Sequence, residues 1–116
     1  PDEETAMLNT APAVVQQYLD AAAIPDYEAL VSCFTSDASV LDDGRTYRGR
    51  AEIRAWREEL ASSFDYTVQV IDAVETGESQ YLVSTRVAGN FPGSPVDLRY
   101  RFTLVDGLID RLEIAP

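Results

Sequence analysis

The stretch ASVLDDGRTYRGRAEIRAW, residues 38–56, decides the fold. Its first residues follow the two-residue period of a strand, which predicts that Ala38, Val40 and Asp42 share one face. The segment GRTYRG, residues 44–49, predicts a turn, because a glycine stands at each of its ends. We therefore expect a strand whose inward face ends in an acid.

The two adjacent acids at the end of this strand allow two interpretations. Asp42 and Asp43 can cap a solvated turn before Gly44, as aspartate does readily. Alternatively, Asp42 points into an apolar cavity, where burial raises the pKa of a carboxyl group and suits it to act as a general base near neutral pH. The residues alone leave both interpretations open.

Helices are predicted on both sides of this strand. Residues 11–23 have apolar side chains at helical spacing, and Asp26 can cap a second short helix that turns Phe34 inward. Residues 50–64 predict a third helix, with Arg57 on its solvent-facing side.

Beyond the third helix the apolar period changes to two. Strands are predicted near residues 65–75, 79–91, 95–105 and 108–115. Three helices combined with such a meander predict an α+β domain over residues 11–116, in which the helices pack on one face of a curved antiparallel (mixed) sheet. Residues 1–10 are expected to be a flexible N-terminal segment.

Composition excludes several classes of function. The 116 residues carry 20 acids against 9 bases, a net charge of -11, which disfavours nucleic-acid and membrane-surface partners. The chain has no histidine, so Ser-His-Asp and Cys-His nucleophiles are excluded, and its single cysteine makes neither a disulfide nor a soft metal site. We expect no metal and no cofactor. No apolar run is long enough to span a membrane and no secretory signal is apparent, so the expected location is the cytoplasm.

The order of elements, with FTSDASVLDD followed by YRGRAEIRAW, resembles the nuclear transport factor 2-like superfamily, and within it the SnoaL-like proteins and the steroid Δ5-isomerases. Gly49, Ile53 and Trp56 match the family pattern at the entry to the third helix. The resemblance implies a cystatin-like, cone-shaped barrel with a deep apolar pocket. It also implies a homodimer that packs through the outer face of the sheet.

The same resemblance implies site residues. The isomerases use a pocket Asp as base and a Tyr with a protonated Asp as hydrogen-bond donors. The matching motifs are DASVLD, which gives Asp42 as the base, and VVQQY, which gives Tyr18 as a donor. The second acid falls on Leu98, and its neighbour Asp97 belongs to the opposite face unless a bulge turns it inward. This departure weakens the expectation of true steroid isomerase activity.

Aromatic and aliphatic side chains are expected to form the pocket wall, and they favour an apolar or aromatic small molecule as ligand. The predicted wall residues are Val40, Tyr47, Trp56, Phe64, Tyr81, Val83, Leu98, Tyr100 and Phe102. If the protein is an enzyme, the expected reaction is cofactor-free proton transfer next to a carbonyl, as in a ketosteroid-isomerase-like or polyketide-cyclase-like protein.

Two alternatives stay open. One is a non-catalytic module of the same fold that binds a small ligand or a protein partner. The other is an epoxide-hydrolase-like enzyme that activates water with an Asp-Arg-Asp set, for which Asp97, Arg99 and Asp110 are the candidates. Strand parity argues against this set, because Asp97 and Arg99 fall with the polar face.

Overall fold

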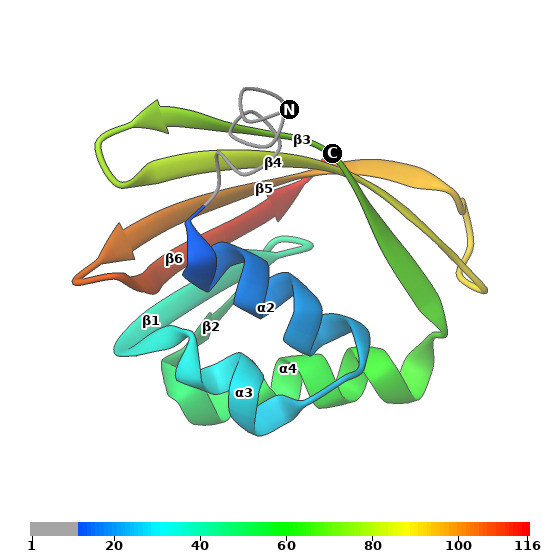
Figure 1. Ribbon diagram of the computed structural model, residues 1–116. Helices are drawn as coiled ribbons and strands as arrows, with labels where there is room; N and C mark the ends of the chain where they lie inside the picture. The colour runs from blue at the N-terminus through cyan, green and yellow to red at the C-terminus, as the bar shows by residue number, and fades with distance from the viewer. Residues whose placement is uncertain (1–11) are drawn as a thin grey trace.

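The computed structural model describes residues 12–116 and shows three helices beside one curved sheet (Figure 1). The predicted flexible segment 1–10 lies outside the described residues. In chain order the elements are α2 (Ala13–Ala23), α3 (Tyr27–Ser32), β1 (Phe34–Asp42), β2 (Arg45–Arg48), α4 (Gly49–Ser63), β3 (Tyr66–Gly77), β4 (Gln80–Gly89), β5 (Val96–Val105) and β6 (Leu108–Ala115).

The sheet has the strand order β2-β1-β6-β5-β4-β3. Strands β1 and β6 run parallel, and every other neighbouring pair is antiparallel. Figure 1 shows all three helices on the concave side of this sheet, with β3 and β4 curling away at the far edge. The predicted α+β class with a mixed curved sheet is confirmed, although the sheet stays open rather than closing into a full barrel.

Residues 45–48 form a strand, whereas the sequence predicted only a turn over residues 44–49. The turn is shorter because Asp43 and Gly44 both adopt positive φ, +52° and +76°, which closes a two-residue hairpin. Tyr47 then pairs with Val40 across the hairpin. The Asp-Gly dipeptide is the local signal for this hairpin.

The second helix is capped as predicted but ends earlier. The Asp26 side chain accepts a hydrogen bond from the Ala29 amide at 3.1 Å. The helix ends at Ser32, and Phe34 belongs to β1 because the Ile109 amide of β6 bonds the Cys33 carbonyl at 2.7 Å. A long-range backbone bond therefore overrides the local helical pattern.

The core lies between the inner face of the sheet and the helices. Alternation along β5 is as predicted, with Tyr100 and Phe102 buried while Arg99 and Arg101 are exposed. Fully enclosed side chains come from every layer: Val15, Leu30, Phe34, Val40, Ile53, Val83, Ile109 and Leu112. This core fixes the end of the sheet that carries β1.

We expect Phe34→Ala to lower the free energy of unfolding by about 3–5 kcal/mol, because a large, fully enclosed ring leaves a cavity when it is removed. Urea unfolding monitored by circular dichroism measures this change. Val105→Ala is the control, since that side chain is 45% exposed at the end of β5 and should change stability by about 0.5 kcal/mol or less. Equal losses in the two variants would contradict this account of the core.

Candidate active site

A cavity of about 940 Å³ opens between helices α2 and α4 and the inner faces of β3, β4 and β5. Its wall is mostly apolar, with a small number of polar side chains that converge on it. Cavities of several hundred cubic ångströms with this composition are typical of small-molecule sites. The polar members that carry chemistry are Tyr18, Asp42, Arg57 and Tyr100.

Asp42 ends β1 and lies on the cavity wall, as the alternation with Ala38 and Val40 predicts. Its Oδ2 atom accepts a hydrogen bond from Nε1 of Trp56 at 3.0 Å. Burial raises the pKa of this carboxyl above its ordinary value, although the hydrogen bond from Trp56 acts in the opposite direction. A carboxylate in this position is more basic than an exposed one, and the Oδ1 atom is free of that bond.

Tyr18 from α2 and Tyr100 from β5 place two phenol side chains on the cavity wall. Their side chains are 2% and 7% exposed, and within residues 12–116 neither hydroxyl has a hydrogen-bond partner. Burial raises the pKa of Tyr100 to about 12 and that of Tyr18 further still, and the negative charge of Asp42 adds to both shifts. Both phenols therefore keep their protons and can donate hydrogen bonds to a ligand.

Arg57 is buried, which corrects the prediction that it faces solvent. Its side chain is 5% exposed, and its guanidinium donates to the hydroxyl of Tyr66 and to the carbonyl of Ala22, the latter at 3.1 Å. The signal was present in the sequence, because residue 57 follows Ile53 by four positions and therefore lies on the same face of α4. The prediction was wrong because a charged side chain on a helix usually faces solvent, whereas Arg57 is on the buried face.

The predicted wall residues divide into two groups. Trp56, Phe64, Leu98 and Tyr100 line the cavity, together with the predicted Asp42 and Tyr18. The others lie outside the wall: Val40, Tyr47, Tyr81, Val83 and Phe102.

Helix packing explains this division. At the β1 end of the sheet the space is filled, since the ring of Tyr18 packs edge-on against Phe34 and Phe102 at centroid distances of 5.6 and 5.9 Å. Tyr47 packs against the ring of Trp56 at 6.0 Å. Strand alternation identifies inward side chains, but it does not tell a core position from a cavity wall.

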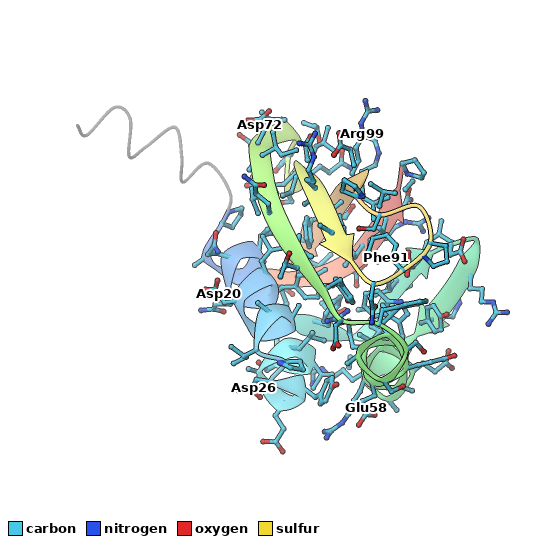
Figure 2. The ribbon with its side chains drawn as sticks, turned by 90° about the vertical axis from the view of Figure 1, so that its right-hand side faces the viewer. Asp20, Asp26, Glu58, Asp72, Phe91 and Arg99 are labelled. Carbon is cyan, nitrogen blue, oxygen red and sulfur yellow. The ribbon has the colours of Figure 1, made fainter. Side chains whose placement is uncertain are left out.

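The sequence did not predict the part of the cavity wall that β3 and the loop between β4 and β5 form. Tyr66 and Val68 from β3 line the cavity, as does Phe91 from the loop. Figure 2 shows Phe91 on this loop near the end of α4, and its ring meets that of Phe64 at 6.1 Å. Two hydrogen bonds hold the loop there: the Asn90 amide donates to the Asp65 carbonyl at 3.0 Å, and the Asp65 amide donates to the side-chain Oδ1 of Asn90 at 2.9 Å. A loop residue carries no periodic signal, which is why it was missed.

The Asp-Arg-Asp alternative is not assembled at the cavity. Asp97 pairs with Arg86 at 2.9 Å on the exposed face, in unbroken register, so no bulge turns it inward. Arg99 lies on the side of the sheet away from the helices (Figure 2), and Asp110 accepts a hydrogen bond from Thr35 at 2.8 Å. None of the three candidates lines the cavity.

Within residues 12–116 no helix has both the length and the hydropathy that a membrane crossing requires. The same residues contain no group of three or more His, Cys, Asp or Glu side chains arranged to hold a metal ion.

We expect Trp56→Phe to raise the apparent pKa of Asp42 further, because the change removes the hydrogen bond that favours the carboxylate. Nuclear magnetic resonance titration of the Asp42 carboxyl carbon measures this value in both proteins. Tyr47→Phe is the matched control, since Tyr47 touches the Trp56 ring without bonding Asp42. A wild-type pKa at or below about 3.9, the ordinary value for aspartate, would contradict the burial of this group.

Comparison with known proteins identifies the family to which the chain belongs. A SnoaL-like domain model matches residues 15–112. A structure from Sinorhizobium meliloti, described as a proposed polyketide cyclase, is 38% identical and has a TM-score of 0.87 over 90% of this chain and 95% of that one. No curated protein matches the chain.

Two more distant structures share the fold. A protein from Catenulispora acidiphila with a ketosteroid isomerase-like fold, solved with trimethylamine, is 19% identical, with a TM-score of 0.80 over 92% of this chain and 87% of that one. A cystatin-fold protein from Novosphingobium aromaticivorans is 18% identical, with a TM-score of 0.76 over 89% and 95% of the two chains. Together with the family match over most of its length, these findings show that the chain belongs to the SnoaL-like domain family of the nuclear transport factor 2-like superfamily.

Proposed function

We propose that this protein is a cofactor-free isomerase or cyclase that moves a proton at a carbon next to a carbonyl of an apolar ring compound. The observation that carries the proposal is a partly buried carboxylate, Asp42, on the wall of a mostly apolar cavity of about 940 Å³. The S. meliloti relative, described as a proposed polyketide cyclase, supports a reaction of this class.

Asp42 is the base in this mechanism. The indole of Trp56 holds Oδ2, which leaves the other carboxylate oxygen to take the proton from the carbon beside the substrate carbonyl. The electron pair of the broken C–H bond moves onto the carbonyl oxygen and forms an enolate. In an isomerisation the protonated Asp42 then returns its proton to another carbon. In a cyclisation the enolate carbon attacks a second carbonyl of the same molecule, and the alkoxide that forms takes the proton back from Asp42.

Tyr18 and Tyr100 are the hydrogen-bond donors to the enolate oxygen. Both keep their protons at neutral pH, and both line the same cavity as Asp42. Donors that are already oriented before charge develops stabilise the transition state more than the ground state. Tyr100 takes the part that the resemblance assigned to an acid, since the position of that acid is the apolar Leu98.

We expect Asp42→Asn to reduce kcat for isomerisation of a Δ5-3-ketosteroid or a simple β,γ-enone by about 10²- to 10⁴-fold, the usual contribution of a general base. Because the base acts when ionised, kcat/KM should rise with pH through an apparent pKa above about 3.9. Absorbance of the conjugated product measures both.

Asp37→Asn is the control for this experiment, since it removes one exposed carboxylate from the same strand and lies outside the cavity wall. Equal rates for the wild type and Asp42→Asn would exclude Asp42 as the base. Ligand binding without any turnover would favour the alternative, a non-catalytic binding module.

We also propose that the protein is a homodimer that packs through the outer face of the sheet. The helices leave this face uncovered (Figure 1), and Val74 of β3 is 40% exposed there. Val74 pairs with Leu82, so these apolar side chains are adjacent on the sheet. An uncovered apolar area on a sheet face favours association with a second copy.

We expect sedimentation equilibrium to give a dimer for the wild type and a larger monomer fraction for Val74→Glu, because the new charge would be buried without a partner at the interface. Val105→Glu is the control, since Val105 is 45% exposed at the end of β5. A wild type that stays monomeric at high micromolar concentration would exclude this arrangement.

A further inference from the structure

Arg57 is the buried cation of the cavity wall, and it has no acidic partner. The ion pairs among residues 12–116 all join exposed or half-exposed side chains: Arg54 with Glu58, Arg86 with Asp97, and Arg111 with Glu113. Arg57, at 5% exposure, takes part in none of them. A buried charge without a paired counter-ion is costly, so its retention in a cavity needs a reason.

The contacts that Arg57 does make leave hydrogen-bonding capacity unused. A guanidinium has five N–H donors, and here one meets the Tyr66 hydroxyl and one meets the Ala22 carbonyl. Its Nε atom is fully enclosed and has no hydrogen-bond partner within residues 12–116. Both of the partners that it has are neutral, and a neutral donor could satisfy them, so they do not explain the positive charge.

Arg57 and Asp42, the acid of the site, both line the cavity but do not form an ion pair with each other. Asp42 accepts its hydrogen bond from Trp56 and not from Arg57, although the two charges lie close enough to influence each other. The rest of the wall is mostly apolar or aromatic, although Asp43 and Asp65 also line it. The ring of Trp56 contributes to this wall, with its centroid 5.7 Å from the guanidinium carbon. A ligand with one anionic end and an apolar ring would complement this arrangement, with its anion at Arg57 and its ring along the wall.

We propose that Arg57 binds a carboxylate of the ligand, so that the substrates of this site are apolar or aromatic ring acids. This inference rests on the proposed function, because it takes the same cavity to be the substrate site and adds the chemical class of the substrate. An Arg–carboxylate pair is often bidentate and stronger than a neutral hydrogen bond, and it gains strength where water is excluded. It therefore overcomes the repulsion that the acidic surface, with a net charge of -11, exerts on an anion.

The test compares 2-naphthoate with 2-naphthamide, a pair of matched shape that differs in charge. Each displaces the neutral fluorescent reporter N-phenyl-1-naphthylamine from the protein. We expect the wild type to bind the naphthoate more tightly than the amide. Arg57→Met should weaken naphthoate binding by about tenfold or more and change amide binding by less than about threefold, as loss of a charge-assisted bond predicts.

Two further variants keep this test decisive. Arg54→Met removes one positive charge from the exposed side of the same helix and should leave the preference for naphthoate intact. Arg57→Gln retains a donor for the Ala22 carbonyl and reports on the charge alone if Arg57→Met fails to fold. A wild type without preference for the carboxylate, or equal weakening of both ligands in the Arg57 variants, overturns the proposal.

The binding experiment distinguishes failure of the carboxylate-binding proposal from failure of the proposed reaction. Asp42→Asn should keep the preference for naphthoate and strengthen it, because the change removes a negative charge near the bound anion. A preserved preference in a protein that shows no isomerisation supports carboxylate recognition and counts only against the proposed reaction.

Discussion

Alternation along β1 is the constraint on which the rest of the site depends. Ala38 and Val40 are completely enclosed between the sheet and the helices, so the two-residue period of a strand carries Asp42 to the same face. A slip of one residue would send the carboxylate to solvent and bring Leu41 inward. The parallel pairing with β6 and the hairpin to β2 hold this register from both sides, so the acid is presented to the cavity by the best-packed part of the sheet.

Two consecutive residues of helix α4, Trp56 and Arg57, make the hydrogen bonds that connect this strand's end and the neighbouring elements around the cavity. Trp56 bonds Asp42, and Arg57 bonds the end of α2 and the first residue of β3, so one turn of helix connects four elements around the cavity. The same turn contributes to the electrostatics of the site, because it brings one indole donor and one cation to a mostly apolar wall that also carries Asp42. In such surroundings each interaction is stronger than it would be in water.

The division between core and cavity follows from where the helices end. Near β1 the rings of Tyr18, Phe34 and Phe102 fill the space, and the polar end of Tyr18 reaches the cavity beyond them. Farther along the sheet, β3 and β4 curve away from the helices (Figure 1), and among residues 12–116 the cavity occupies the space between these strands and helices α2 and α4. The loop that carries Phe91 forms the wall on that side, held to α4 by its contact with Phe64. A rigid core and an open cavity thus share one sheet face.

The sequence by itself determined the class of fold and the order of the elements, and its strand period placed Asp42 on the same face as Ala38 and Val40, because periodicity and turn residues are local properties of the chain. It also placed Tyr18, Trp56 and Tyr100 inside, since each lies on an apolar stripe. Only the tertiary structure decided which inward residues meet open space, that Phe34 leaves its helix to pair in the sheet, and that Arg57 is buried. Those outcomes depend on where distant segments of the chain end and on which buried donors find hydrogen-bond partners. The spacing of residues along one helix or strand does not predict either property.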